Sequence, residues 1–260
     1  MKIKGLNTWF PTGRNFFGKS KGVVKAVNQV TFDVYPGETL GLVGESGCGK
    51  TTLGRSILRL IEPTSGSVNF ENTDLRKLKK DDLREIRRDI QIIFQDPYSS
   101  LNPRLTVGDS LMEPLQVHQF YTNNTQRKKR VLELLERVNL LPEHFNRYPH
   151  EFSGGQRQRI VIARALALQP KFIICDESVS ALDVSVQAQV LNLIRELQQE
   201  FNLTYIFISH DLAVIKHISD RMMVMNKGEI IEMGDPDDIY YHPKEEYTKK
   251  LIASIPGKVA

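Results

Sequence analysis

Hydrophobic and polar positions follow two different patterns along this chain. Over the first 34 residues they alternate, most clearly at residues 30–34, which predicts antiparallel strands with one buried face. Uninterrupted apolar runs come later and predict strands that are buried on both faces. These runs cover residues 39–43, 90–94, 172–175 and 204–208.

Between these runs, apolar residues recur at helical spacing. Strands that alternate with helices favour an α/β fold with a mostly parallel sheet, which binds ligands at the carboxyl ends of its strands. A Pro-, Ser- and Asn-rich stretch, residues 96–105, predicts an irregular connection. The expected helices start at residue 50 and extend through Ile61, cover residues 127–141, run from Ser153 to near Pro170, and include residues 190–197.

No linker of biased composition divides the chain. We therefore expect residues 1–260 to form a single domain, with a helical subdomain inserted at about residues 97–164.

A glycine-rich loop between the first apolar run and the next helix is the most informative motif. Its glycines permit backbone conformations that turn successive N–H groups inward, and the positive end of the helix would face the enclosed anion. The Lys50 ammonium would reach the β- and γ-phosphates of a nucleotide, and the Thr51 hydroxyl would ligate Mg²⁺. The motif predicts a nucleotide site made of Gly44, Glu45, Ser46, Gly47, Cys48, Gly49, Lys50, Thr51 and Thr52.

Two carboxylates directly follow the apolar run 172–175. Asp176 suits a Mg²⁺ shell, and Glu177 suits a base that orients an attacking water. Paired acids after a strand are often only a solvated loop or a helix cap. A phosphate loop in the same sheet favours the catalytic interpretation.

Composition narrows the class of protein further. A hydrophobic content of 40% and a charged content of 25% are typical of a folded, soluble protein. The net charge is only +4, and we interpret the basic clusters at residues 84–88 and 127–130 as solvent-exposed helix faces. We therefore expect no nucleic-acid partner. A disulfide between Cys48 and Cys175 would tie up the nucleotide loop, which favours reduced thiols in the cytosol. We find neither a membrane-spanning apolar run nor a signal peptide.

A second helix end suited to phosphate follows Phe152. Ser153 is a good N-cap, and two glycines leave the first N–H groups of the helix open. By itself this could be an ordinary capped helix. This chain, however, already has one such helix end at the phosphate loop. Residues 152–159 (Phe-Ser-Gly-Gly-Gln-Arg-Gln-Arg) resemble the signature motif of ATP-binding cassette (ABC) ATPases. The resemblance implies a head-to-tail dimer that closes over two ATP molecules, in which the partner's nucleotide is covered by Ser153, Gly154, Gly155 and Gln156.

The resemblance spans almost the whole chain and implies further roles. Gln95 matches the family's glutamine that touches Mg²⁺ and the attacking water, and His210 matches the switch histidine that contacts the γ-phosphate. Asp183 lies in a segment that resembles the loop through which partner subunits sense each other's site. An aromatic residue near the N-terminus usually stacks on adenine; Phe10 is the chosen candidate, with Trp9 close behind. The implied metal ligands are thus Thr51, Gln95 and Asp176, and the implied catalytic residues Lys50, Glu177 and His210.

Residues 95–103 are similar to the oligopeptide and dipeptide importer branch of the family, a pattern that nickel and glutathione systems share. Ser178 departs from the branch, which usually has proline after the catalytic glutamate. Serine restores a backbone N–H and loosens the loop, but it removes no reactive group.

The resemblance implies a P-loop NTPase (RecA-like) core with an N-terminal antiparallel β subdomain and a helical insertion. It implies an ATPase subunit, with ATP and Mg²⁺ as cofactors, that powers the uptake of peptides or similar small solutes. The implied location is cytoplasmic, peripheral on the inner face of the cell membrane, where the chain would dock on transmembrane permease subunits. The other implied partners are a second cassette and, indirectly, a solute-binding protein. Whether that cassette is identical, and whether the chain is half of a tandem, stays open.

Two alternatives differ in class. A non-transport ABC protein that acts on nucleic acid or ribosomes usually carries long coiled-coil insertions or two linked cassettes, and this sequence shows neither. A degenerate cassette would bind ATP without hydrolysis, but Glu177 and His210 are both retained.

Overall fold

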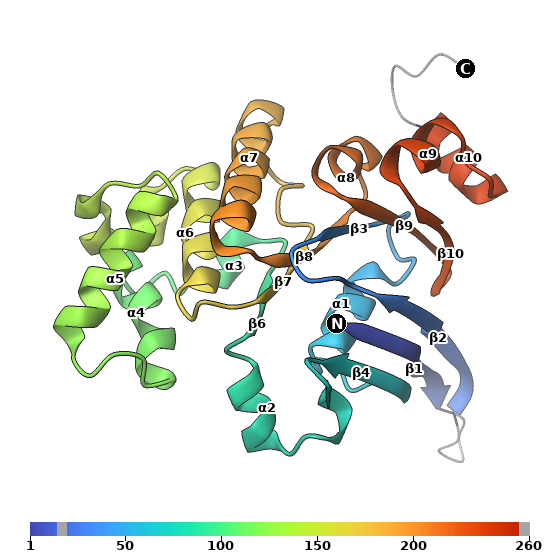
Figure 1. Ribbon diagram of the computed structural model, residues 1–260, viewed down its shortest axis with the longest axis horizontal. Coiled ribbons are helices and arrows are strands. Elements are labelled where there is room, and N and C mark those ends of the chain that lie inside the picture. Colours follow the sequence, from blue (N-terminus) through green and yellow to red (C-terminus); the bar gives the residue numbers. More distant parts are fainter. Residues whose placement is uncertain (15–19, 255–260) are drawn as a thin grey trace. The chain divides into compact units, whose positions relative to one another are not determined.

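The computed structural model describes residues 1–14 and 20–254. The chain divides into two compact units, the first made of Met1–Leu83 and Thr204–Ala260 and the second of Arg84–Leu203. The second unit includes the expected helical insertion and extends beyond it on both sides. Figure 1 labels the helices and strands of both units.

An antiparallel sheet begins the first unit and confirms the alternating pattern. Ile3 lies opposite Phe32 and Leu6 opposite Val30, and all four side chains are buried on one face. Helix α1 (Lys50–Ile57) packs on two strands of this sheet, β1 and β2. The strand order is β2-β1-β4-β5, with β1 at Lys2–Arg14, β2 at Ser20–Asp33, β4 at Ser65–Phe70 and β5 at Thr73–Asp74.

The mainly parallel strands of the first unit hold its core. Every residue of β3 (Thr39–Val43) and β8 (Thr204–Ser209) is buried, as the apolar runs predict, and the two strands are parallel. On its other side β3 is parallel to β9 (Arg221–Asn226), which pairs antiparallel with β10 (Glu229–Gly234). Helix α8 (Leu212–Ile218) packs on β3 so closely that a Cβ at Gly41 would lie 2.4 Å from the Ile215 side chain. The C-terminal helices are α9 (Pro236–Tyr241) and α10 (Glu246–Ala253).

Helix α1 (Lys50–Ile57) is shorter than the sequence predicts. It ends at Ile57 because Arg59 adopts a left-handed conformation with φ of 49°. The Arg59 guanidinium then donates to the carbonyls of Leu75 and Leu78, beside the short 3₁₀ segment Leu75–Lys77. The predicted extension of the helix to Ile61 is therefore wrong. The hydrogen bonds from Arg59 stabilise a turn after Ile57, and the periodicity of apolar residues gives no sign of these contacts.

The second unit combines two parallel strands with a set of helices, and the chain enters it through α2 (Lys80–Ile86). Strand β6 (Ile90–Ile93) pairs in parallel with β7 (Phe172–Asp176), with Ile90 opposite Phe172. Helix α6 packs on β6 and on its helical neighbours α3, α4, α5 and α7. The helices are α3 (Pro97–Ser100), α4 (Val107–Val117), α5 (Asn124–Arg137), α6 (Gly154–Leu166) and α7 (Val184–Phe201), with 3₁₀ segments at Pro142–Asn146 and Pro149–Glu151.

Three expectations about the second unit need correction. Helix α5 spans Asn124–Arg137 rather than residues 127–141, and Asn139 beyond it has a φ of 57°. Residues 97–100 form a helical turn within the stretch predicted to be irregular, because the Asp96 carboxylate accepts the Tyr98 N–H at 2.8 Å and proline suits the first helical position. Helix α6 ends at Leu166 rather than near Pro170, and Gln169 beyond it has a φ of 54°.

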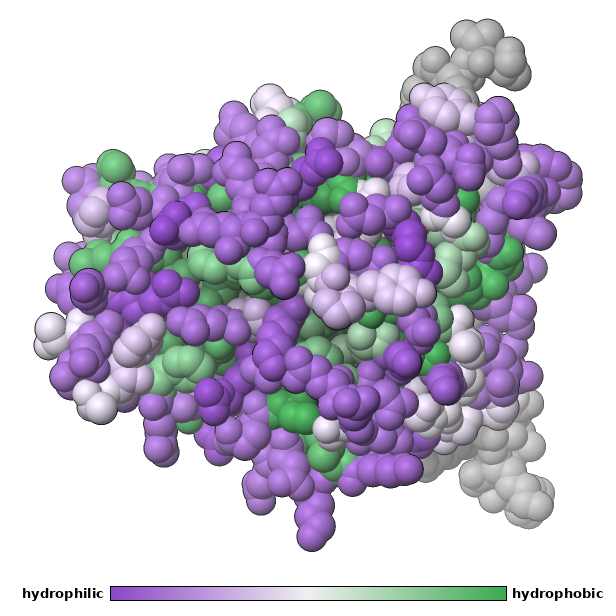
Figure 2. Space-filling model, viewed as in Figure 1, coloured by the Kyte–Doolittle hydropathy of each residue, from purple (hydrophilic) through white to green (hydrophobic). Residues whose placement is uncertain are grey.

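The surface is mainly hydrophilic on the face shown in Figure 2, where apolar residues form only small patches. Across residues 1–14 and 20–254, none of the helices has both the length and the hydropathy that a membrane span requires.

Candidate nucleotide site

The phosphate loop joins β3 to α1 in the first unit, as predicted. Gly49 is the N-cap of α1, has a φ of 113°, and offers no side chain to cap the helix. A Cβ at this position would lie 2.1 Å from the Ala26 carbonyl oxygen, so only glycine fits. The uncapped N–H groups at the start of α1 therefore remain suited to an anion such as a phosphate.

Lys50 places a positive charge at this loop. The residue is 4% exposed, and its Nζ donates to the carbonyls of Gly44 at 2.7 Å and Glu45 at 3.0 Å. These bonds fold the long side chain back across the loop. The ammonium is thus preorganised close to the backbone that would surround a phosphate group.

Cys48 gives the loop an uncharged thiol. Burial raises the pKa of Cys48, while the nearby Lys50 ammonium acts in the opposite direction. The Cys48 N–H donates to the Glu45 carbonyl at 3.2 Å, and the Cys48 carbonyl accepts the Gly228 N–H at 2.9 Å. A protonated thiol adds no negative charge that would repel phosphate.

Tyr247 on α10 is a contact to the loop that the sequence did not reveal. The Glu45 N–H donates to the Tyr247 hydroxyl at 3.1 Å, and burial raises the pKa of this tyrosine. The contact joins residues 202 positions apart. No local signal in the sequence could have indicated it.

His210 directly follows β8 and is exposed. The backbone after it is fixed, because the Asp211 N–H donates to the Ser209 hydroxyl at 3.0 Å and the Asp211 carboxylate accepts the Ala213 N–H at 2.8 Å. The first unit therefore presents this histidine from a rigid turn at the carboxyl end of a parallel strand.

The two aromatic candidates for adenine stacking are neighbours on β1. Phe10 is 40% exposed and lies opposite Val24, whereas Trp9 is 36% exposed and lies opposite Lys25. The Lys25 ammonium lies 5.0 Å from the centroid of the Trp9 ring. One face of Trp9 is thus already engaged by a cation.

In the second unit the structure brings Gln95 and Glu177 together. Gln95 follows β6, Glu177 follows β7, and the Gln95 amide donates to the Glu177 carboxylate at 3.0 Å. Glu177 has a φ of 50°, a costly conformation for a non-glycine residue that often marks functional sites. The N–H and the hydroxyl of Ser180 both donate to the Glu177 carbonyl, at 3.2 and 2.9 Å, and hold it in this conformation.

The residues on either side of this glutamate are buried. Asp176 ends β7 and is almost fully enclosed, as is Ser178, the residue that departs from the family pattern. Burial raises the pKa of the Cys175 thiol to about 12, and the nearby Ser178 hydroxyl partly offsets this effect. Ser178 thus contributes to packing at the turn.

The signature segment forms the N-terminus of α6. Ser153 is the N-cap predicted from the sequence: its hydroxyl accepts the Gln156 N–H at 3.3 Å, and the Gln156 amide oxygen accepts the Ser153 N–H at 3.0 Å. Gly155 has a role beyond the predicted one, since a Cβ there would lie 2.4 Å from the Val186 side chain. It permits close packing of α6 on α7.

Asp183 is the exposed N-cap of α7, and its side chain makes no capping bond.

The predicted metal ligands fit Mg²⁺ by their chemistry. The Thr51 hydroxyl lies in the first turn of α1 in the first unit, and the Gln95 amide and the Asp176 carboxylate end β6 and β7 in the second. Within the described parts of the chain, no group of three or more His, Cys, Asp or Glu side chains could hold a metal. Oxygen ligands with few carboxylates are typical of Mg²⁺ that is held largely by nucleotide phosphates and water.

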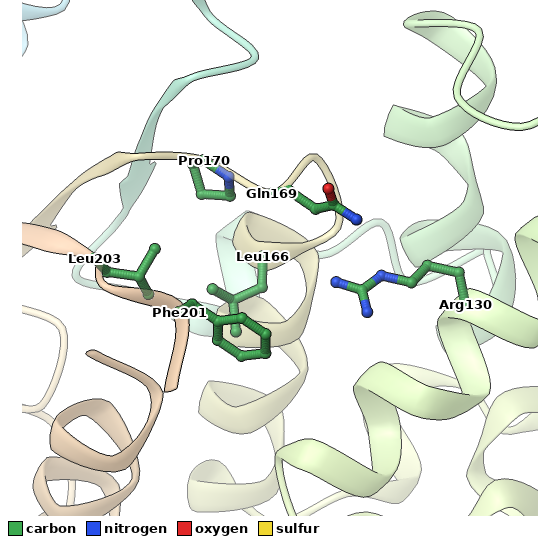
Figure 3. Close-up of a pocket in the computed structure, with 6 residues that line it drawn as sticks. All are labelled: Arg130, Leu166, Gln169, Pro170, Phe201 and Leu203. Carbon is green, nitrogen blue, oxygen red and sulfur yellow. The ribbon is translucent and has the colours of Figure 1, made fainter. Parts of the chain in front are cut away.

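A cavity of about 390 Å³ lies elsewhere in the second unit, among α5, the end of α6 and the end of α7. In Figure 3 the Arg130 guanidinium extends from α5 toward Gln169 and the Leu166 side chain. None of the predicted site residues lines this cavity, so we do not assign it to the nucleotide.

Comparisons with known proteins agree with the geometry. A family model described as ABC transporter matches residues 27–180. The oligopeptide transport ATP-binding protein OppF of Bacillus subtilis (strain 168) is 57% identical over 98% of this chain and 82% of its own length. The glutathione import ATP-binding protein GsiA of Pectobacterium atrosepticum is 54% identical over 98% of this chain, which spans only 41% of that protein.

Among solved structures, an ATP-binding cassette dimer in a post-hydrolysis state with ADP and Pi is 31% identical, with a TM-score of 0.80. The match covers 90% of this chain and 98% of that one. These similarities confirm the expected fold, with its antiparallel N-terminal sheet and helical insertion. The chain therefore belongs to the ABC transporter family of ATP-binding cassette ATPases.

Proposed function

We propose that this cassette binds and hydrolyses ATP to drive the import of oligopeptides, dipeptides or similar small solutes. The observation that carries the proposal is the hydrogen bond from the Gln95 amide to the carboxylate of Glu177, a residue with a positive φ at the end of a parallel strand. The similarity to OppF and GsiA, whose names describe oligopeptide transport and glutathione import, supports this class of cargo.

In the first unit, the loop N–H groups and Lys50 would bind the β- and γ-phosphates of ATP. His210 would contact the γ-phosphate, and the Phe10 ring would stack on adenine. We favour Phe10 over Trp9 because Lys25 already engages Trp9. The remaining contacts to the nucleotide would come from Glu45, Ser46, Cys48, Thr51 and Thr52 of the loop.

In the second unit, Glu177 would accept a proton from the attacking water while Gln95 fixes its orientation. Gln95 and Asp176 of this unit, and separately Thr51 of the first unit, would serve as ligands for Mg²⁺, which when bound neutralises charge that develops on the phosphates. The protein's own part is mainly positioning and electrostatic stabilisation.

The partners follow from the same proposal. Ser153, Gly154, Gly155, Gln156 and Asp183 would meet the nucleotide site of a second cassette in a head-to-tail dimer. The chain would act as one nucleotide-binding domain with an inserted helical subdomain, docked on permease subunits at the inner face of the cell membrane. A solute-binding protein would deliver the cargo on the other side.

Uptake by cells that lack this chain tests the cargo. Restoring the wild-type gene should restore the uptake of labelled dipeptides, oligopeptides or glutathione, and the Lys50→Ala gene should not. Purification of the tagged chain from native membranes should also recover permease subunits and show whether the second cassette is identical. Normal uptake of all three solutes without the chain would contradict the transport assignment.

Mixed dimers test the composite sites. Ser153→Arg chains should bind ATP but fail to dimerise, because a bulky cation replaces a hydroxyl at the interface. Mixing them with Lys50→Ala chains places both changes in one site of a symmetric dimer and should restore partial ATPase activity. Full activity of Ser153→Arg alone at every protein concentration would contradict this arrangement.

A further inference from the structure

Arg157, in the first turns of α6, is a buried cation without a carboxylate partner among the described residues. It is 6% exposed, and its guanidinium donates to the carbonyls of Pro149 at 2.7 Å and His150 at 3.4 Å. A buried charge that is balanced only by carbonyl dipoles is costly, so each remaining contact matters to its position.

One further contact of Arg157 is aromatic. The Arg157 guanidinium carbon lies 3.6 Å from the centroid of the Tyr98 ring, well within the range of a cation–π interaction. Tyr98 nevertheless remains 63% exposed. It covers the guanidinium from the surface.

Tyr98 belongs to α3, the helical turn that follows Gln95. Its N–H is held by the Asp96 carboxylate at 2.8 Å, and the Ser100 hydroxyl donates to the Asp96 carbonyl at 2.7 Å. These bonds make α3 a rigid extension of the strand end that carries Gln95. The position of the Tyr98 ring therefore follows the position of Gln95.

A second link joins the same two helices. The Arg164 guanidinium donates to the Ser100 carbonyl, and burial lowers the pKa of Arg164. Arg157 and Arg164 are about two helical turns apart and thus lie on the same face of α6. Both ends of α3 are fastened to this face.

We propose that Tyr98 is a positioning residue, whose ring holds Arg157 and thereby keeps the Ser153 end of α6 in a fixed position relative to Gln95. The inference deepens the proposed function, because Gln95 contacts the hydrolytic carboxylate and Ser153 is assigned to the partner's nucleotide. The ring requires no catalytic chemistry of its own: it presents a π face that an aliphatic side chain of similar size lacks.

Two variants of Tyr98 separate the π face from mere bulk. Tyr98→Phe keeps the ring, whereas Tyr98→Leu removes it and keeps an apolar side chain. Tyr121→Leu is the matched control, since the Tyr121 ring packs against Phe120 at 6.3 Å. Tyr98→Met provides a second non-aromatic variant should the leucine variant melt without cooperativity.

The first readout is amide hydrogen exchange over residues 154–160 of the full-length chain. We expect exchange to be about five- to tenfold faster in Tyr98→Leu than in wild type, and nearly unchanged in Tyr98→Phe and Tyr121→Leu. The second readout is the protein concentration at which ATP drives dimerisation, which should rise by a similar factor in Tyr98→Leu only. The dissociation constant for ATP below that concentration should stay the same, since the phosphate loop is untouched.

Equal behaviour of Tyr98→Leu and Tyr98→Phe in the exchange measurement would overturn the proposal. A rise in the ATP dissociation constant equal to the change in dimerisation would also overturn it, because the effect would then not be specific to the signature end. If the wild-type chain neither hydrolyses ATP nor dimerises with it, the proposed function fails, but the exchange measurement still decides the role of Tyr98.

Discussion

The amide of Gln95 donates a hydrogen bond to the carboxylate of Glu177 at 3.0 Å, and so connects the ends of two parallel strands. Glu177 itself is held at a positive φ by two bonds from Ser180 to its carbonyl. The carboxylate is therefore fixed from its side chain and from its backbone. Such fixation suits a base that must meet a water molecule in one orientation.

Removal of the Gln95 amide should slow hydrolysis more than it weakens binding. We expect Gln95→Met to lower kcat by about tenfold or more, because hydrogen bonds to charged groups contribute about 1.5–3 kcal/mol. Gln91→Met is the matched control, since Gln91 lies on β6, the strand that Gln95 follows, and donates to the Arg87 carbonyl instead. Equal rates for both variants in a steady-state ATPase assay would contradict this role.

Lys50 should control affinity for ATP. Lys50→Ala removes the ammonium from the loop, so we expect the dissociation constant for ATP to rise by about a hundredfold, with a nearly unchanged thermal melt. Calorimetric titration measures the constant, and Lys129→Ala serves as an exposed control. An unchanged constant would show that the phosphates bind elsewhere.

Tyr247 should affect affinity from the C-terminal helix. Tyr247→Phe removes the acceptor of the Glu45 N–H, which we expect to raise the dissociation constant for ATP about three- to fivefold. Tyr241→Phe also removes a hydroxyl from this part of the chain, one that accepts from Lys216 at 2.8 Å. It should leave the constant unchanged. Similar effects of the two variants would mean that the Tyr247 contact does not act through the loop.

Cys175 should make stability depend on alkaline pH. Its pKa is raised by burial to about 12 from 9.0, so the unfolded chain loses this proton first as the pH rises. The contribution is fully present below pH 9 and is lost between about pH 9 and pH 12. Between pH 8 and pH 10.5, the free energy of unfolding measured by urea titration should fall by about 2 kcal/mol more in the wild type than in Cys175→Ala. Equal losses would contradict the raised pKa.

The elements that the sequence predicted are those with a local signal. The buried strands 39–43, 172–175 and 204–208 are apolar runs, and the phosphate loop and the Ser153 cap are short motifs with a fixed order of residues. Local steric and hydrogen-bonding rules determine these features, so they can be read without knowledge of the rest of the chain.

The features that could not be predicted from the sequence depend on contacts between residues that lie far apart along the chain. Tyr247 reaches the phosphate loop across 202 positions, and Tyr98 meets Arg157 across 59. The early end of α1 reflects the bonds from Arg59 to the Leu75 and Leu78 carbonyls. Periodicity along the chain carries no information about such pairs, because it reports only which face of an element is buried.

Hydrolysis by Glu177→Gln tests the central claim most directly. The substitution keeps the size of the side chain but removes the carboxylate that would accept the water's proton. ATP turnover should fall by a factor of about a hundred or more, while the dissociation constant for ATP stays close to wild type and the ATP-bound dimer accumulates. Wild-type turnover by Glu177→Gln, measured on protein with normal ATP affinity, would contradict the assignment of Glu177 and with it the proposed mechanism.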